Sequence, residues 1–273
     1  MTDGLDELRT LALAAAHAGA AVLLEHQRAR HDAETLRIDT KTSATDPVSE
    51  ADRAAERAVL ETITAARPDD AVLAEEGQGD QPGSSGLRWV VDPLDGTVNF
   101  LMRVPQWAVS VAVEDEHGPL VGVVVHPEHG EQHVAVRGRG AELGRADGTT
   151  ARLQVSGRAG LGRALLATGF GYDPVLRAAQ GRAAATWLAH VRDLRRAGAA
   201  ALDLAWVAAG RLDAYAESGL QPWDWAAGRL LVTEAGGRVS EFDVELAGSM
   251  RRTLVASAPD VHAALVEMVA RGA

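Results

Sequence analysis

Two carboxylates three residues apart follow a short apolar run in residues 89–100, which read WVVDPLDGTVNF. The apolar residues 89–91 predict a buried strand that ends at Asp92, and Asp95 follows. An unpaired carboxylate at the edge of a core is unfavourable unless a cation compensates it. The nearest arginines flank the segment, and no lysine follows Lys41. The segment therefore points to a bound cation, and carboxylate oxygens suit Mg²⁺ better than Zn²⁺.

The residues after these acids add an anion-binding feature. Gly96 permits close backbone approach, and Gly96 and Thr97 at a predicted helix start offer free N–H groups to an anion. A metal beside a helix start indicates phosphate chemistry. An ordinary strand-to-turn connection is the alternative. A phosphatase of the haloacid dehalogenase type is a second one, but its motif is Asp-x-Asp-Gly-Thr. The extra residue here points the second carboxylate to the opposite side of an extended segment.

Other acids could join this site. Glu75 and Glu76 follow a short strand predicted at residues 72–74, although such a pair is also typical of a solvated turn. Asp224 lies between two tryptophans at a predicted helix start, where the alternative is an N-cap.

Two further patterns, a histidine cluster and a glycine-rich stretch, do not predict a binding site. His126, His129 and His133 suggest zinc, but they lie around a Pro/Gly hairpin turn with no cysteine and no HExxH helix, so we expect solvated loop histidines. Residues 138–144 miss the dinucleotide-binding pattern by one residue and lack a convincing strand–helix–strand unit.

Composition limits the function classes. The 273 residues hold 27 Lys plus Arg and 38 Asp plus Glu, a net charge of −11, which disfavours a broad nucleic-acid-binding face. The absence of cysteine excludes disulfides, thiolate nucleophiles and Cys-ligated zinc. Residues 1–30 lack the features of a secretory signal, and the uncharged stretch 10–24 is shorter than a spanning helix. We expect a cytoplasmic protein with no membrane and no nucleic-acid partner.

Hydrophobic periodicity predicts helices alternating with strands, which favours a layered α/β or α+β architecture. A loop or short hairpin is expected at 37–47, and the turn-rich stretch 138–157 divides an N-terminal half, about 1–145, from a C-terminal half, about 150–273. Helices are expected at 3–30, 49–66, 174–190, 198–209, 224–235 and 259–271, and strands at 72–74, 89–91, 107–113, 120–125, 132–136, 164–168 and 214–217.

Taken together, these motifs resemble the inositol monophosphatase family of Mg²⁺-dependent, lithium-sensitive phosphatases. One signature covers residues 89–110 and another covers residues 223–237. Lys41, Asp46, residues 48–52 and the pair Glu75 and Glu76 match the remaining landmarks in order. The resemblance implies one domain with a layered αβαβα sandwich, and a homodimer.

The resemblance also implies a role for individual residues. Glu75, Asp92 and the carbonyl of Leu94 would hold one Mg²⁺, and Asp92, Asp95 and Asp224 a second, with two or three ions per site. Thr97 bonded to Asp52, with Glu75 and Lys41, would form the catalytic group. The substrate-binding positions would be Asp95, Gly96, Thr97, Gly198, Ala199, Ala200, Glu217 and Asp224.

The expected function is hydrolysis of myo-inositol 1-phosphate or a similar polyol phosphate by two-metal activation of water. Histidinol phosphate, fructose 1,6-bisphosphate and an adenosine bisphosphate are alternative substrates within the family. A regulatory or binding protein that retains the fold is an alternative of another class.

Overall fold

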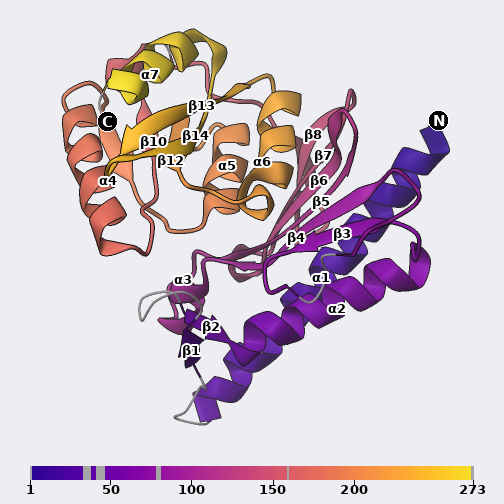
Figure 1. Cartoon of the computed structure of the whole chain (residues 1–273). Coiled ribbons are helices and arrows are strands. Elements are labelled where there is room, and N and C mark those ends of the chain that lie inside the picture. The colour runs from indigo at the N-terminus through magenta and orange to yellow at the C-terminus, as the bar shows by residue number, and fades with distance from the viewer. Residues whose placement is uncertain (1, 33–37, 41–46, 78–80, 159, 272–273) are drawn as a thin grey trace.

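The computed structural model arranges the chain in five layers of alternating helices and sheets (Figure 1). It describes residues 2–32, 38–40, 47–77, 81–158 and 160–271. The predicted hairpin near residues 37–47 is present as β1 (Ile38–Thr40) paired antiparallel with β2 (Pro47–Ser49). Lys41 and Asp46 lie outside the described residues.

The larger sheet has seven strands in the order β3-β4-β5-β6-β7-β8-β9, so each strand lies beside its neighbour in sequence. Helices α1 (Thr2–Asp32) and α2 (Glu50–Ala66) cover one face. The strands are β3 (Ala71–Ala74), β4 (Arg88–Asp95), β5 (Ala108–Asp115), β6 (Gly118–His126), β7 (Glu131–Val136), β8 (Gly140–Arg145) and β9 (Thr150–Arg152).

The smaller sheet has five strands in the order β11-β10-β12-β14-β13. Its strands are β10 (Leu165–Ala167), β11 (Asp193–Arg195), β12 (Ala214–Ser218), β13 (Arg238–Leu246) and β14 (Ser249–Ser257). Helices α5 (Ala200–Ala208) and α6 (Pro222–Glu234) lie between the two sheets, and α4 (Pro174–Trp187) and α7 (Pro259–Arg271) lie on the outer side (Figure 1). The predicted αβαβα layering is confirmed.

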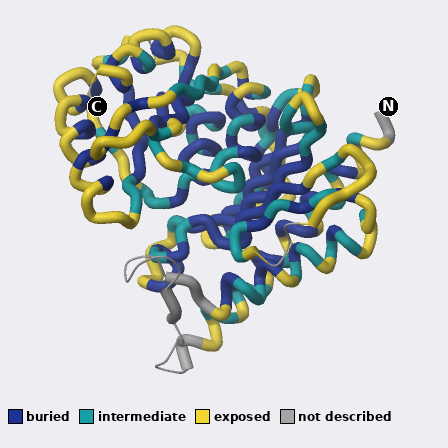
Figure 2. The backbone as a smooth tube through the Cα atoms, in the orientation of Figure 1, coloured by how far each residue is buried: buried dark blue, intermediate teal, exposed yellow. Residues whose placement is uncertain are grey.

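The central strands are buried on both faces, which explains their continuous apolar runs. In β5, Val109, Val111 and Val113 pack in the core that includes α1 and α2. Ala108 and Ala112 face the core that includes α5 and α6. Figure 2 shows this buried band of strands crossing the middle of the molecule. Complete burial of a valine stabilises the fold by about 1.5 to 3 kcal/mol relative to exposure.

A close backbone contact sets α6 against the larger sheet. A Cβ added to Gly122 of β6 would lie 2.8 Å from the carbonyl oxygen and 3.0 Å from the Cα of Ala227 in α6. No real Cβ tolerates such a distance, so only glycine permits this approach. Helix α6 carries Asp224, so the contact also fixes the depth of that residue.

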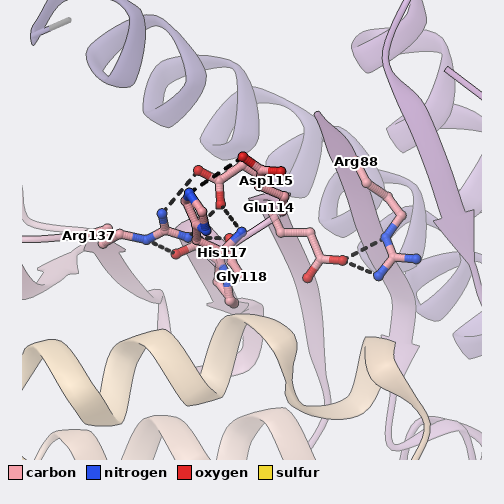
Figure 3. Close-up of polar contacts among 8 residues, drawn as sticks. Arg88, Glu114, Asp115, His117, Gly118 and Arg137 are labelled. Carbon is pink, nitrogen blue, oxygen red and sulfur yellow. Dashed lines mark hydrogen bonds and ion pairs between the residues drawn. The ribbon is translucent and has the colours of Figure 1, made fainter. Parts of the chain in front are cut away.

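Arginine pairs hold the outer end of β4, β5 and β6 together (Figure 3). Arg88 of β4 pairs with Glu114 directly across the ladder in β5. Arg137 follows β7, and its guanidinium contacts both carboxylate oxygens of Asp115 at 3.0 and 3.1 Å. It also donates to the carbonyl oxygens of Gly118 and Pro119. These pairs lie at the far end of the strands from the acidic motif.

Several expected elements differ from the structure. Strand β4 does not end before Asp92 but continues to Asp95, with a shift of pairing register between these two residues. The stretch expected to be turn-rich, 138–157, contains β8 and β9. Strands β11, β13 and β14 were not predicted. The alternation of residues 242–246 (FDVEL) and the apolar run 254–256 (LVA) are strand signals that the sequence prediction missed, and β11 is only three residues long.

Helix α1 has a longer apolar stretch than its uncharged segment 10–24 suggests. Over Gly4–Ala29 it is long and apolar enough, by length and composition, to cross a membrane. Its buried residues include Ala12, Ala16 and Leu23, which pack in the core with residues of α2 and β5. A helix whose apolar face fills the core of a layered domain passes the same test.

Candidate active site

The ends of β4 and β12 and the starts of α3 (Thr97–Leu101), α5 and α6 surround a pocket of about 510 Å³. All four acids that the sequence assigns to metal binding line it, and so do Leu94, Gly96, Thr97 and Glu217. These residues come from both sheets, and more than 120 positions separate Asp95 from Glu217 in sequence. The fold therefore brings the predicted set together.

Asp92 lies at the deepest point of the motif and is 2% exposed. Its Oδ1 accepts a hydrogen bond from the backbone N–H of Leu94 at 3.0 Å. Burial, and next the charges of Glu75, Asp95 and Asp224, raise the pKa of Asp92 well above its usual value. The four carboxylates are thus close enough to disfavour one another's charge.

Asp95 faces the first turn of α5. Its Oδ1 accepts from the N–H of Ala200 at 2.9 Å, and its Oδ2 accepts from Ala201 at 2.8 Å and Leu202 at 3.3 Å. These N–H groups have no partner within the helix, and the positive end of the helix dipole favours a carboxylate. Burial outweighs the three bonds and raises the pKa of Asp95 to about 7.

Asp224 is the third residue of α6, so the alternative that it is merely the N-cap is wrong. The helix begins at Pro222 after Gln221, and Asp224 Oδ2 accepts the backbone N–H of Gln221 at 2.7 Å. Proline, which lacks an N–H, is suited to the first helical position and moves the start two residues earlier. Burial, followed by the charge of Glu75, raises the pKa of Asp224 well above its usual value.

The hydroxyl of Thr97 lies 3.1 Å from Oδ1 of Asp52 and 3.3 Å from the carbonyl oxygen of Leu94. Asp52 belongs to α2 and is completely buried. A hydroxyl has only one hydrogen to donate. The carboxylate of Asp52 is the nearer and the stronger of the two acceptors, so it receives that hydrogen. Gly96, with φ of 93°, places Thr97 at the start of α3. The predicted Thr97–Asp52 contact is therefore present.

Glu217 lines the same pocket from β12. Its Oε2 accepts a hydrogen bond from the hydroxyl of Tyr215 at 2.7 Å. A Cβ on Gly169 would collide with its carboxylate, so the loop can approach Glu217 only because residue 169 is glycine. Burial raises the pKa of Glu217, while the Tyr215 bond and the charge of Arg196 oppose that rise.

The donors suit a hard divalent cation. Asp92, Asp95 and Asp224 make no ion pair with a basic side chain among the described residues, so no described basic side chain compensates the repulsion among these carboxylates. Uncompensated carboxylates at this spacing fit Mg²⁺ by ligand type. No three acidic or histidine side chains of the described residues stand in a metal-binding arrangement. Binding therefore requires Asp95 and Asp224, which bond to backbone amides, to turn toward a common point.

The pocket also contains residues that the sequence did not single out as site residues. Gly198, Ala199 and Ala200, which were predicted to bind substrate, line the pocket, and Gly171 and Tyr172 also line it. Arg196, Phe170 and Trp223 line it as well. The available signal for Arg196 is its position two residues before the segment 198–200, which the sequence assigns to substrate binding.

The three histidines do not all lie in a solvated loop. His126 on β6 and His133 on β7 are completely buried, and only His129, in the turn Pro127–His129, is exposed. Burial lowers the pKa of His133 to about 4. Neither ring nitrogen of His133 has a hydrogen-bond partner among the described residues. The expectation is thus wrong for two of the three, and the described structure contains no histidine cluster able to bind a metal.

Comparison with known proteins gives consistent results. A model of the inositol monophosphatase family matches residues 4–271. The Nus factor SuhB of Pseudomonas aeruginosa is 46% identical over 214 residues, which cover 73% of each chain. The inositol-1-monophosphatase of Mycobacterium leprae is 40% identical over 240 residues, covering 86% of this chain and 81% of that protein. The crystal structure of extragenic suppressor protein suhB from Bartonella henselae matches with a TM-score of 0.85 at 35% identity, covering 98% of this chain and 100% of that one. This chain therefore belongs to the inositol monophosphatase family.

Proposed function

We propose that this protein is a Mg²⁺-dependent phosphomonoesterase that hydrolyses myo-inositol 1-phosphate or a similar polyol phosphate. One observation carries the proposal: the acids Glu75, Asp92, Asp95 and Asp224 line one pocket together with Glu217, a carboxylate suited to hydroxyl groups. The relative named inositol-1-monophosphatase supports the same activity.

The acids divide into two overlapping sets of oxygen ligands. Glu75, Asp92 and the carbonyl oxygen of Leu94 would hold one ion, and Asp92, Asp95 and Asp224 the other, so that Asp92 is shared. When bound, Mg²⁺ supplies the positive charge that phosphate oxygens require and the acidification of water that hydrolysis requires. Two or three ions per site are consistent with this number of donors.

Thr97 and Asp52 orient the attacking water in this proposal. Because the Thr97 hydroxyl gives its hydrogen to Asp52, its lone pairs remain available to accept a hydrogen bond from water. Glu75, which lines the same pocket, offers a second acceptor. Together they point the oxygen lone pair of the water toward phosphorus. Lys41, which the family resemblance adds to this group, stays a prediction because it lies outside the described residues.

Glu217 and the start of α5 would bind the alcohol part of the substrate. Tyr215 occupies Oε2 of Glu217, so Oε1 is left to accept hydroxyl hydrogens of a polyol. The backbone of residues 198–200 lines the same side, and Ala199 contributes no hydroxyl there. Asp95, Gly96, Thr97 and Asp224 would contact the phosphate end.

A binding or regulatory protein is the second candidate function, because relatives such as that of Pseudomonas aeruginosa carry the name Nus factor SuhB. The acids in the pocket favour catalysis, since binding alone gives no reason to gather four mutually repelling carboxylates in one pocket. The charge of −11 supports our proposal that nucleic acid is not a direct partner, and a gel-shift titration at low salt tests it.

Phosphate release decides between the two functions. The purified chain is incubated with Mg²⁺ and inositol 1-phosphate, histidinol phosphate, fructose 1,6-bisphosphate, adenosine 3′,5′-bisphosphate or p-nitrophenyl phosphate, then with a chelator and with Li⁺. Turnover that the chelator abolishes and Li⁺ inhibits supports the phosphatase. Absence of turnover with every ester, or turnover that survives chelation, overturns it.

A further inference from the structure

The pocket is strongly acidic, and its described lining contains one basic side chain, that of Arg196. Six carboxylic acids face the same space: Glu75, Asp92, Asp95, Asp173, Glu217 and Asp224. Arg196 follows β11 and precedes the glycine that leads into α5. Its side chain is exposed to solvent and lines the acidic pocket, so it is accessible to a ligand that enters there.

The chain folds so that the guanidinium of Arg196 lies over its own loop. Gly198 has φ of +88°, and a Cβ at this position would collide with Nη1 of Arg196. Asn99 of α3 holds the same loop from the other side, because its Nδ2 donates to the carbonyl oxygens of Ala197 at 2.8 Å and Gln106 at 2.6 Å. The arginine is therefore placed by a glycine that leaves room for it and by a loop that an asparagine anchors.

The N–H donors of the Arg196 guanidinium are available to a ligand. Arg196 makes no hydrogen bond and no ion pair within the described structure, whereas its neighbour Arg195 pairs with Asp193 at 2.6 Å. Its charge opposes the rise in pKa of Glu217 and of Asp203. The cation thus stands beside the carboxylate assigned above to the alcohol part of the substrate.

We propose that Arg196 is a specificity-determining residue that binds a second anionic group, a phosphate or a carboxylate, on the alcohol part of the substrate. The inference rests on the proposed function, because it takes the metal-binding acids to hold the phosphate that is removed. A guanidinium forms two parallel hydrogen bonds with either anion, and its five donors allow it to serve an adjoining hydroxyl as well. The favoured substrates would be phosphomonoesters of hydroxylated alcohols with a second negative charge.

The test compares three substrates in wild type and Arg196→Gln with Mg²⁺. Inositol 1-phosphate has no second anion, fructose 1,6-bisphosphate has a second phosphate, and 2-phosphoglycerate has a carboxylate. We expect Arg196→Gln to lower kcat/KM roughly 10- to 100-fold for an anionic substrate and at most about threefold for inositol 1-phosphate. The anionic substrate that loses activity identifies the anion that Arg196 binds.

Two further variants control for charge and geometry. Arg195→Gln removes the same charge one residue away, outside the pocket lining, and we expect all three kcat/KM values to stay within about twofold of wild type. Arg196→Lys keeps the charge without the two-pronged donor, so it should recover part of the loss. Thermal unfolding of each variant checks that the fold is retained.

The possible failures are distinct. If wild type releases phosphate from none of these esters and not from p-nitrophenyl phosphate, the proposed function itself is wrong. If wild type hydrolyses inositol 1-phosphate but neither anionic substrate, or if Arg196→Gln changes all substrates by one common factor or not at all, only the role of Arg196 is overturned.

Discussion

The hydroxyl of Thr97 and Oδ1 of Asp52 lie 3.1 Å apart, joining the start of α3 to the first turn of α2 across 45 positions of sequence. Both side chains are buried, at 7% and 0% exposure. This bond fixes the direction of the Thr97 lone pairs toward the pocket. The contact therefore links an N-terminal helix, outside the pocket lining, to the proposed chemistry.

Replacing Thr97 tests that link. Thr97→Val keeps the shape and removes the hydroxyl, so we expect kcat for inositol 1-phosphate to fall about 100-fold or more, with KM changed little. Thr97→Ser restores the hydroxyl and should recover most of kcat. Steady-state kinetics at saturating Mg²⁺ measure both variants. A Thr97→Val enzyme with wild-type kcat would remove Thr97 from the mechanism.

Replacing Asp92 separates activity from stability. Asp92 is buried among like charges, so Asp92→Asn should leave the Tm in chelator unchanged or raise it, while kcat falls at least about 100-fold. Differential scanning calorimetry and phosphate release measure the two effects. Asp243→Asn, a carboxylate outside the pocket lining, is the control and should leave kcat near wild type. A lowered Tm together with lowered kcat in Asp92→Asn would make this acid structural.

Replacing Glu217 should raise KM for a polyol phosphate more than for an aryl phosphate. Glu217→Gln replaces the charged hydroxyl acceptor, so we expect KM for inositol 1-phosphate to rise roughly tenfold, with KM for p-nitrophenyl phosphate nearly unchanged. Tyr215→Phe removes the bond that holds Oε2 and should give a smaller change in the same direction. An equal change for both substrates would contradict polyol recognition by Glu217.

His133 should make the fold sensitive to acid. Burial lowers its pKa to about 4, with the charges of Glu131, Arg211 and His126 acting nearby. Between about pH 6.5 and pH 4 the unfolded chain binds a proton here and the folded chain does not. The free energy of unfolding therefore falls as pH falls through this range, by about 3 kcal/mol in total.

Urea denaturation at several pH values measures this effect. His133→Leu should remove this part of the pH dependence, and it also removes two buried nitrogens without partners. His117→Gln alters an exposed histidine and should retain the wild-type slope. An unchanged slope in His133→Leu would show that other groups cause the acid sensitivity.

Gly122 should be essential for the packing of α6 against β6. Gly122→Ala forces its Cβ against the backbone of Ala227, so we expect a loss of about 1 to 3 kcal/mol in the free energy of unfolding. Gly181 in α4 has open space around it, and Gly181→Ala should stabilise the protein by up to about 1 kcal/mol. Chemical denaturation of the wild type and both variants measures these changes in the free energy of unfolding. A neutral Gly122→Ala would mean that α6 can move away without cost.

The layered fold and the pocket were predictable from sequence to different degrees. Long helices with apolar faces and the strands before the acidic motif have strong local patterns, and the structure contains them. The motif residues were found because several acids follow strand ends or begin helices. Strands β13 and β14 were not predicted, although residues 242–246 alternate apolar and acidic types; the first half of each strand is largely polar, and antiparallel pairing over Arg238–Leu246 and Ser249–Ser257 holds the two together.

The burial of two histidines was the largest error of the sequence analysis, and its cause is non-local. His126 and His133 lie in a stretch rich in Pro, Gly and Glu, which suggests exposure. The structure packs the ring of His126 near that of Trp206 in α5, with centroids 6.1 Å apart, and no local pattern reveals a partner 80 residues away. Arg196 was missed for a similar reason, since its place depends on Gly198 and Asn99 together.

The order of strands in the smaller sheet determines when that sheet can fold during translation. Strand β12, which carries Glu217, pairs on one side with β10 and on the other with β14, near the C-terminus. A nascent chain on the ribosome can complete the seven-stranded sheet early, yet the layer that holds Glu217 has no partner for one side until residues 249–257 emerge. The acids of β4 are therefore made well before α5, β12 and α6, the elements that complete their pocket.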